Sequence, residues 1–124
     1  MAYSVAFKDH LTRPRHAGEL ADANAVAEAT NPVCGDRLRI TLRISDGQIT
    51  GVGFLAYGCP PTLVCGSVLS ALVEGMTVHD ALQITKSELL DQIGGLPSRK
   101  HHAASLAIET LRTAIESACS EILQ

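Results

Sequence analysis

The chain has 124 residues, of which 46% are hydrophobic and 19% charged, and its formal net charge is −3. This length suits a single domain over residues 1–124, and this composition predicts a packed core rather than a disordered chain. The mild negative charge, with two Tyr, two Phe and no Trp, argues against a nucleic-acid partner, because such partners need a basic surface or aromatic stacking platforms.

The chain also lacks the marks of a membrane or secreted protein. Its longest apolar stretch, at 61–73, is too short to cross a bilayer, and Lys8 and Asp9 stand where a signal peptide needs an unbroken apolar block. We therefore expect a cytoplasmic protein with no membrane partner. Four cysteines, at 34, 59, 65 and 119, could form two disulfides. In a reducing compartment, cysteines in glycine-containing loops are better interpreted as metal ligands or reactive thiols.

The first part of the chain predicts a short helix, a loop and a strand. Residues 3–12 place Phe7 and Leu11 on one helical face, with Pro14 beyond the end. Residues 16–23 form a loop around Gly18, and 24–30 are a further strand candidate.

The clearest pattern is a hairpin at 37–57. In its first half, apolar and polar residues alternate with the period of a half-buried strand: Leu38, Ile40, Leu42 and Ile44 alternate with Arg37, Arg39, Thr41 and Arg43. Asp46-Gly47 predicts a tight turn, and 48–57 return as the partner strand. The arginine row is either a solvated face or a docking surface for an acidic partner.

Helices follow the strands. Residues 61–74 have helical apolar spacing with Gly75 at the stop, and Thr77–Asp80 and Thr85–Glu88 fit capping boxes. Gly94-Gly95 and Pro97 precede a last helix at about 99–123, with expected core positions Leu106, Ala107, Leu111, Ala114, Ile115, Ala118, Cys119 and Ile122. The pattern predicts an α+β fold: a three-stranded antiparallel sheet covered on one face by helices, with a long C-terminal helix.

Cys34 and Asp36 lie in the segment NPVCGD, just before the first strong strand. Gly35 lets the backbone pass close to whatever the thiol binds. In extended backbone, residues two apart point to the same side, so both side chains could face one ion. The alternative is a cysteine at a strand edge and an aspartate that forms a turn.

Cys59 lies in YGCPPT, where the hairpin ends and a helix begins. Pro60 and Pro61 suit the first turn of a helix. A thiol beside a helix N-terminus favours its thiolate form, which binds metal or sulfur. The alternative is a small apolar residue in a tight turn.

Cys65 and the pair His101-His102 each allow two interpretations. Cys65 lies among apolar neighbours inside the helix, which favours a buried, inert thiol. Adjacent histidines cannot share one helix face, so at most one of His101 and His102 points at a site, and spacing alone favours two solvated histidines.

Together, these segments resemble the iron–sulfur cluster assembly scaffold proteins of the IscU/NifU N-terminal-domain type. The resemblance covers nearly the whole chain. Its most specific segment is NPVCGD, followed by YGC at 57–59, the LP..K pattern at 96–100 and the H…LA pattern at 102–107.

The resemblance implies a set of site residues and partners. Cys34 and Cys59 match two of three family cysteines that hold the nascent cluster, Asp36 an acidic ligand, His102 the histidine ligand and Lys100 a lysine near the site. It implies a non-enzymatic scaffold that binds iron and sulfide, builds a labile [2Fe–2S]-type cluster and passes it to apo iron–sulfur proteins. The sulfur donor would be a cysteine desulfurase.

The chain departs from the family at one ligand. The third family cysteine follows the histidine, whereas this chain has Ala103. Cys65 is a candidate replacement, and a cluster shared in a homodimer would also suit a site that lacks one thiolate. The competing function is sulfur transfer for a cysteine desulfurase, with zinc in the same site.

Overall fold

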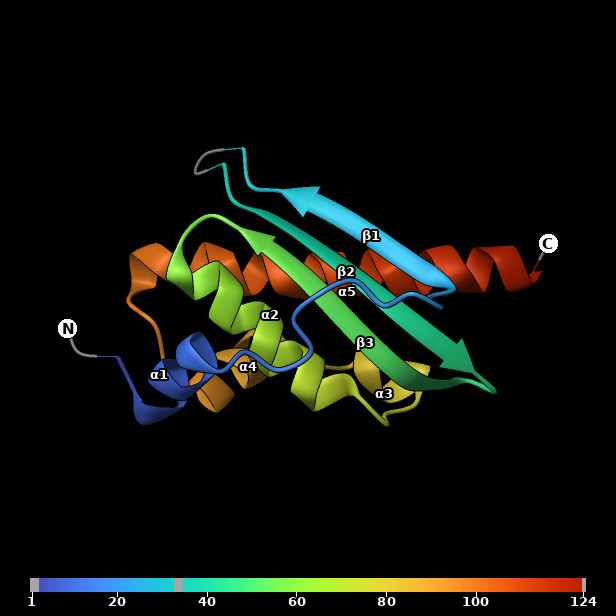
Figure 1. Ribbon diagram of the computed structural model, residues 1–124, viewed down its shortest axis with the longest axis horizontal. Coiled ribbons are helices and arrows are strands. Elements are labelled where there is room, and N and C mark those ends of the chain that lie inside the picture. The colour runs from blue at the N-terminus through green and yellow to red at the C-terminus, as the bar shows by residue number, and fades with distance from the viewer. Residues whose placement is uncertain (1–2, 33–34, 124) are drawn as a thin grey trace.

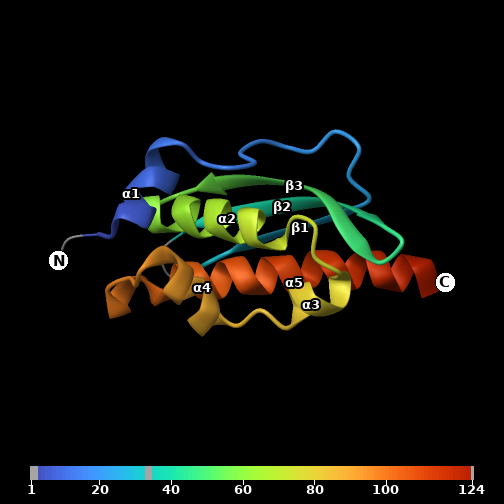
Figure 2. The same cartoon turned by 90° about the horizontal axis from the view of Figure 1, so that it is seen from below.

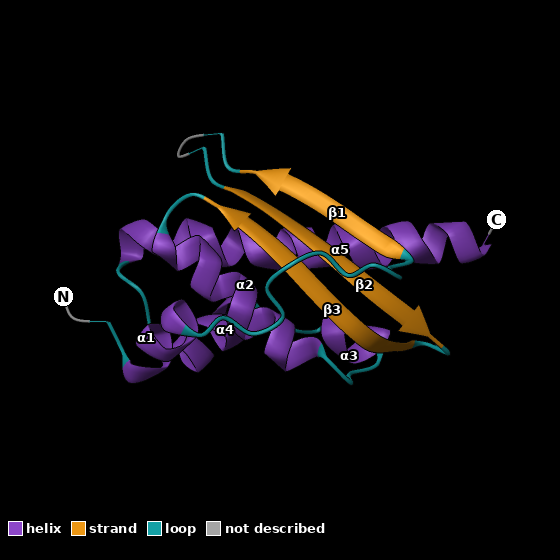
Figure 3. Ribbon diagram, viewed as in Figure 1, coloured by secondary structure: helices purple, strands orange, loops and turns teal. Residues whose placement is uncertain are grey.

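The computed structural model describes residues 3–32 and 35–123, the side chains of 119–123 excepted. The elements in chain order are α1 (Val5–Thr12), β1 (Ala25–Thr30), β2 (Arg37–Ser45), β3 (Gln48–Tyr57), α2 (Pro60–Val73), α3 (Val78–Leu82), α4 (Lys86–Ile93), the 3₁₀ turn η1 (Ser98–Lys100) and α5 (His101–Leu123). The strands form an antiparallel sheet in the order β1-β2-β3, which confirms the predicted α+β fold (Figures 1 and 3).

The hairpin turns at the predicted dipeptide. Asp46 and Gly47 both have positive φ, 53° and 75°, which a two-residue turn between right-twisted strands requires. The register pairs Arg37 with Tyr57 at the open end of the hairpin. The next residues outward, Asp36 and Gly58, therefore lie opposite each other.

Helices cover one face of this sheet. The long helix α5 packs along β1 and β2, α2 packs on β3, and these two helices contact each other (Figure 2). The contact between α2 and β3 is close: a Cβ at Gly66 would lie 2.7 Å from the ring of Phe54. Within the described residues, no helix is both long and apolar enough to cross a membrane.

The opposite face of the sheet is partly covered by the chain that precedes β1 (Figure 2). Gly18 donates its backbone N–H to the carbonyl oxygen of Phe54 at 2.8 Å, and Leu20 donates its N–H to the hydroxyl of Thr41 at 3.1 Å. Thr41 is consequently only 3% exposed. The alternation puts Thr41 on the same face as the three arginines of β2, but strand periodicity does not report the loop that covers it.

The arginines of β2 are neutralised by acidic residues of the same chain. The ion pairs are Arg37–Glu28, Arg39–Glu19 and Arg43–Asp22. Each of these arginines is at least partly exposed. Their internal partners favour the interpretation as a solvated face over a docking surface for an acidic partner.

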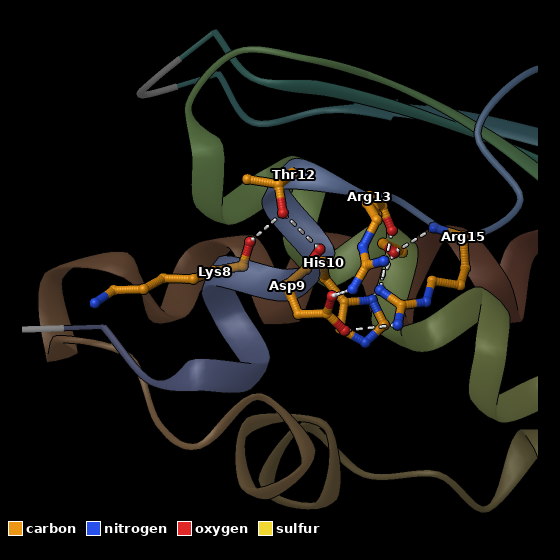
Figure 4. Close-up of polar contacts among 7 residues, drawn as sticks. Lys8, Asp9, His10, Thr12, Arg13 and Arg15 are labelled. Carbon is orange, nitrogen blue, oxygen red and sulfur yellow. Dashed lines mark hydrogen bonds and ion pairs between the residues drawn. The ribbon is translucent and has the colours of Figure 1, made fainter.

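Helix α1 is fixed at its beginning and at its end. The Ser4 hydroxyl accepts a hydrogen bond from the backbone N–H of Phe7 and donates one to the carbonyl oxygen of Ile93, which links α1 to α4. Asp9 forms ion pairs with Arg13 at 3.1 Å and Arg15 at 2.6 Å (Figure 4).

A buried hydroxyl connects α1 to α2. The Oγ of Ser67, which is 0% exposed, lies 2.7 Å from His10 Nδ1 and accepts the backbone N–H of Arg15 at 2.8 Å. Burial lowers the pKa of His10, and the charge of Arg15 lowers it further. The charge of Asp9 opposes these two effects but does not outweigh them, so the surroundings of His10 favour a neutral imidazole.

The helices begin and end close to the positions that the sequence predicts. Thr85 and Glu88 form a complete capping box, and the Thr77 side chain accepts the N–H of Asp80. The last helix begins at His101 because 98–100 form the separate turn η1. The predicted core positions from Leu106 to Ala118 are buried, whereas Cys119 and Ile122 belong to the stretch whose side chains are not described.

Candidate metal centre

Three side chains from distant parts of the sequence converge at the open end of the hairpin. Asp36 immediately precedes β2, Cys59 is the N-cap of α2, and His102 is in the first turn of α5. One ligand atom from each, a carboxylate oxygen, a sulfur and a ring nitrogen, lies within 4.8 Å of the others. The hairpin register and the starts of two helices thus build a site of mixed O, S and N donors.

Asp36 is the shared partner in this site. Its Oδ2 lies 3.4 Å from Cys59 Sγ and 3.1 Å from His102 Nε2, and its Oδ1 accepts the backbone N–H of Cys59 at 3.1 Å. The side chain of Asp36 is 4% exposed and that of His102 22% exposed. The carboxylate therefore forms the floor of the site, and the thiol and imidazole stand nearer its rim.

The surroundings favour an ionised Asp36. Burial raises the pKa of this carboxyl, but hydrogen bonds from Cys59, His102 and Thr62 outweigh burial and bring the pKa below its ordinary value. At neutral pH the site thus offers a carboxylate that can act as an oxygen ligand.

The structure brings His102, and not His101, to the aspartate. His102 Nδ1 lies 3.1 Å from the carbonyl oxygen of Arg99. A carbonyl only accepts, so Nδ1 can only act as the donor in this contact. Nε2, which faces Asp36 Oδ2, is the ring nitrogen that a metal in this site would meet. The ring of His101 instead meets the carbonyl oxygen of Leu96 at 2.9 Å.

The other predicted site residues are near this cluster in the sequence or lie outside the described residues. Cys34 is outside the described residues. Gly35 has φ 75° and donates its N–H to the carbonyl oxygen of Asn31 at 2.7 Å. Lys100 is half-buried in η1, two residues before His102. Ala103, at the position where the resemblance expects a third cysteine, is 0% exposed.

Cys65 is not a member of the three-residue cluster among the described residues. A helix advances 1.5 Å per residue, so six residues place Cys65 about 9 Å further along the axis than Cys59. Its thiol is 0% exposed, and burial, with a smaller contribution from Cys59, raises its pKa to about 12. These features favour a core thiol over a replacement ligand.

Sequence reasoning missed two residues of the site, Gly58 and Thr62. Gly58 has φ 134°, and a Cβ there would lie 2.0 Å from Asp36 Oδ1. Thr62, in the first turn of α2 and 0% exposed, has its hydroxyl 3.5 Å from Cys59 Sγ. A hydroxyl three residues after a cysteine that starts a helix was a usable signal, since side chains at this spacing lie on one side of the turn.

The donor set suits a borderline metal. Thiolate and imidazole favour iron or zinc, whereas Ca²⁺ and Mg²⁺ prefer oxygen alone. Ligand atoms of a tetrahedral zinc site stand roughly 3.5 Å apart. The separations of 3.4 Å and 3.1 Å from Asp36 Oδ2 are close to this value, and all three ligand atoms lie within 4.8 Å of one another.

Comparison with known proteins identifies relatives over almost the whole chain. The family model described as "NifU-like N terminal domain" matches residues 2–121. The chain is 36% identical over 113 residues to "Iron-sulfur cluster assembly scaffold protein IscU 1" of Archaeoglobus fulgidus, covering 91% of this chain and 74% of that protein. It is 35% identical over 116 residues to the IscU scaffold protein of Aquifex aeolicus, covering 92% of this chain and 74% of that protein.

A solved structure supports the fold independently. The N-terminal part of a nitrogen-fixing NifU-like protein from Brucella abortus superposes with a TM-score of 0.77, covers 94% of both chains and is 18% identical in sequence. At this identity, the likeness establishes the architecture alone.

Proposed function

The chain belongs to the family of NifU-like N-terminal domains, and on this basis we propose that it is a non-enzymatic scaffold for iron–sulfur cluster assembly. It binds iron and sulfide, holds a labile [2Fe–2S]-type cluster and passes the cluster to apo-proteins. The observation that carries this proposal is the convergence of Asp36, Cys59 and His102 within 4.8 Å. The names of the relatives, which refer to cluster assembly, favour it over zinc-dependent sulfur transfer.

The proposed ligands are Cys59, Asp36 and His102, with Cys34 as the second thiolate. The Cys59 thiol donates a hydrogen bond to Asp36 Oδ2, so it must release its proton to solvent as the iron arrives. The Asp36 carboxylate offsets the positive charge of the metal, and His102 presents Nε2 with its other nitrogen anchored on the Arg99 carbonyl. Lys100 and Gly35 belong to the surroundings of this site.

The donor set also explains how a cluster could leave. Carboxylate and imidazole bind iron less firmly than thiolates do, so a cluster held partly by Asp36 and His102 is easier to release than one held by thiolates alone. Thiol and imidazole stand nearer the surface than the carboxylate, so sulfide and an acceptor protein approach the rim. A cysteine desulfurase supplies the sulfur, and apo iron–sulfur proteins accept the product.

Cluster transfer tests this proposal directly. The protein is loaded with iron and sulfide without oxygen, separated from free ions and mixed with an apo-ferredoxin, whose circular dichroism reports cluster acquisition. We expect transfer from the wild-type protein and a loss of transfer in Cys59→Ala. A wild-type protein that binds only zinc and transfers no cluster would contradict the proposal.

A further inference from the structure

The first turn of α2 offers the Cys59 sulfur few of the hydrogen-bond donors that a helix N-terminus normally supplies. At most helix starts, free backbone N–H groups point at the N-cap side chain. Here the first two helical residues are Pro60 and Pro61, and proline has no N–H. The next amide, that of Thr62, donates to the carbonyl oxygen of Cys59 at 3.0 Å.

The side chain of Thr62 lies beside the sulfur that lacks those amides. Its hydroxyl is 3.5 Å from Cys59 Sγ, and it also contributes to keeping the pKa of the Asp36 carboxyl below its ordinary value. Thr62 is 0% exposed, and no buried side-chain N or O atom of the described residues is without a partner. The Thr62 hydroxyl thus lies beside the sulfur of one proposed metal ligand, Cys59, and influences a second, Asp36.

Metal binding changes the hydrogen bonds that these acceptors need. In the structure, the Cys59 thiol donates to Asp36 Oδ2. A metal-bound thiolate has no proton to donate and becomes a strong acceptor. Of the side chains that contact Cys59 Sγ among the described residues, Thr62 carries the hydroxyl that can donate to it.

We propose that Thr62 is a positioning residue for the metal centre, whose hydroxyl takes the place of the amides absent at Pro60 and Pro61 and hydrogen-bonds the Cys59 thiolate once metal is bound. This inference rests on the proposed function. In this role Thr62 orients the sulfur of Cys59 and stabilises part of the charge of its thiolate. Hydrogen bonds to ligand sulfurs also raise the reduction potential of a bound cluster.

Cobalt binding to the full chain tests the inference without cluster assembly, because Co²⁺ shows a sulfur-to-metal absorption band when a thiolate binds it. Thr62→Val, which keeps the shape and removes the hydroxyl, should weaken Co²⁺ binding by about 10–100-fold and shift that band. Thr62→Ser should restore both. Thr110→Val is the matched control, because Thr110 is also 0% exposed but its hydroxyl donates to Leu106 O within α5.

A second variant tests the role of the missing amides. In the Thr62→Val background, Pro61→Ala returns an N–H to the second helical position and should recover part of the lost affinity. If Thr62→Val does not fold, as judged by circular dichroism, Thr62→Ala replaces it in both comparisons.

The outcomes separate this inference from the proposed function. If the wild-type protein binds Co²⁺ through thiolate and Thr62→Val binds it equally well with the same spectrum, the role of Thr62 is overturned and the metal site stands. A wild-type protein that shows no thiolate band would overturn the proposed metal site itself. Equal losses in Thr62→Ser and Thr62→Val would assign the effect to packing and reject the hydroxyl.

Discussion

Gly58 and Asp36 lie so close that a Cβ at position 58 would come within 2.0 Å of Asp36 Oδ1. This contact follows from the hairpin, whose last pair is Arg37 with Tyr57, so that the residues just beyond it face each other. The absence of a side chain at Gly58 lets the carboxylate lie against the backbone of the YGC segment and accept the Cys59 N–H.

We therefore predict that Gly58→Ala displaces the Asp36 carboxylate and weakens Co²⁺ or Zn²⁺ binding by about 10–100-fold, because a misplaced ligand oxygen no longer meets the ion. Isothermal titration calorimetry measures this loss. Gly75→Ala is the control: Gly75 also has positive φ, 88°, but has nothing within 4 Å of the added Cβ. Both variants lose about 1–3 kcal/mol of folding free energy from backbone strain. Normal metal affinity in Gly58→Ala would count against the contact.

The two adjacent histidines, His101 and His102, should differ in their effect on metal binding. We expect His102→Gln to lower metal affinity by about tenfold or more, because it removes the Nε2 ligand. His101→Gln should leave metal affinity unchanged, since His101 hydrogen-bonds Leu96 O instead. Binding titrations with Co²⁺ check both, and the reverse ranking would show that the ligand had been misassigned.

Much of the architecture could be predicted from the sequence because it depends on local periodicity. The alternation in 37–45 and the turn at Asp46-Gly47 define the hairpin, and the Gly and Pro residues at 94–97 separate the last helix from α4. The burial of Thr41 could not be predicted, since it depends on a loop that returns across the sheet.

The candidate site was only partly predictable. Cys59 at a helix start was recognisable from the following prolines, but spacing alone favoured solvated histidines at 101 and 102. The choice of His102 came from the family resemblance, and in the structure its ring reaches Asp36 from a helix far along the chain. Thr62 and Gly58 escaped notice because their roles depend on contacts with Asp36.

Cys65 provides a further test, because its thiol is buried and its pKa is raised to about 12. At pH 8 it stays protonated, and we expect iodoacetamide to modify Cys59 in the folded protein while Cys65 reacts only after denaturation. Peptide mass spectrometry distinguishes the two. We also expect Cys65→Ser to bind cluster as well as the wild-type protein does; a clear loss would instead support Cys65 as the replacement for the thiolate absent at Ala103.

His10 should make stability depend on pH. Burial and the charge of Arg15 lower its pKa below the ordinary value of about 6.5, so below that pH the unfolded chain binds more protons at this residue than the folded chain does. The contribution of His10 to the free energy of unfolding should therefore have its full value above about pH 6.5. It should fall as the pH decreases toward the lower pKa of the folded state.

Urea unfolding at pH 7.5 and 5.5 measures this effect. His10→Asn, which does not titrate, should show a smaller loss between the two values than the wild-type protein. His79→Asn is the control, because His79 is exposed in α3. An unchanged pH dependence in His10→Asn would show that burial and the charge of Arg15 do not favour the neutral imidazole at this position.

The most direct test of the proposed scaffold is the amount of iron and acid-labile sulfide bound per chain after reconstitution without oxygen, with zinc counted in the same sample. The account predicts iron and sulfide in roughly equal amounts, and their loss in Cys59→Ala. Zinc alone, with no stable iron or sulfide, would contradict it.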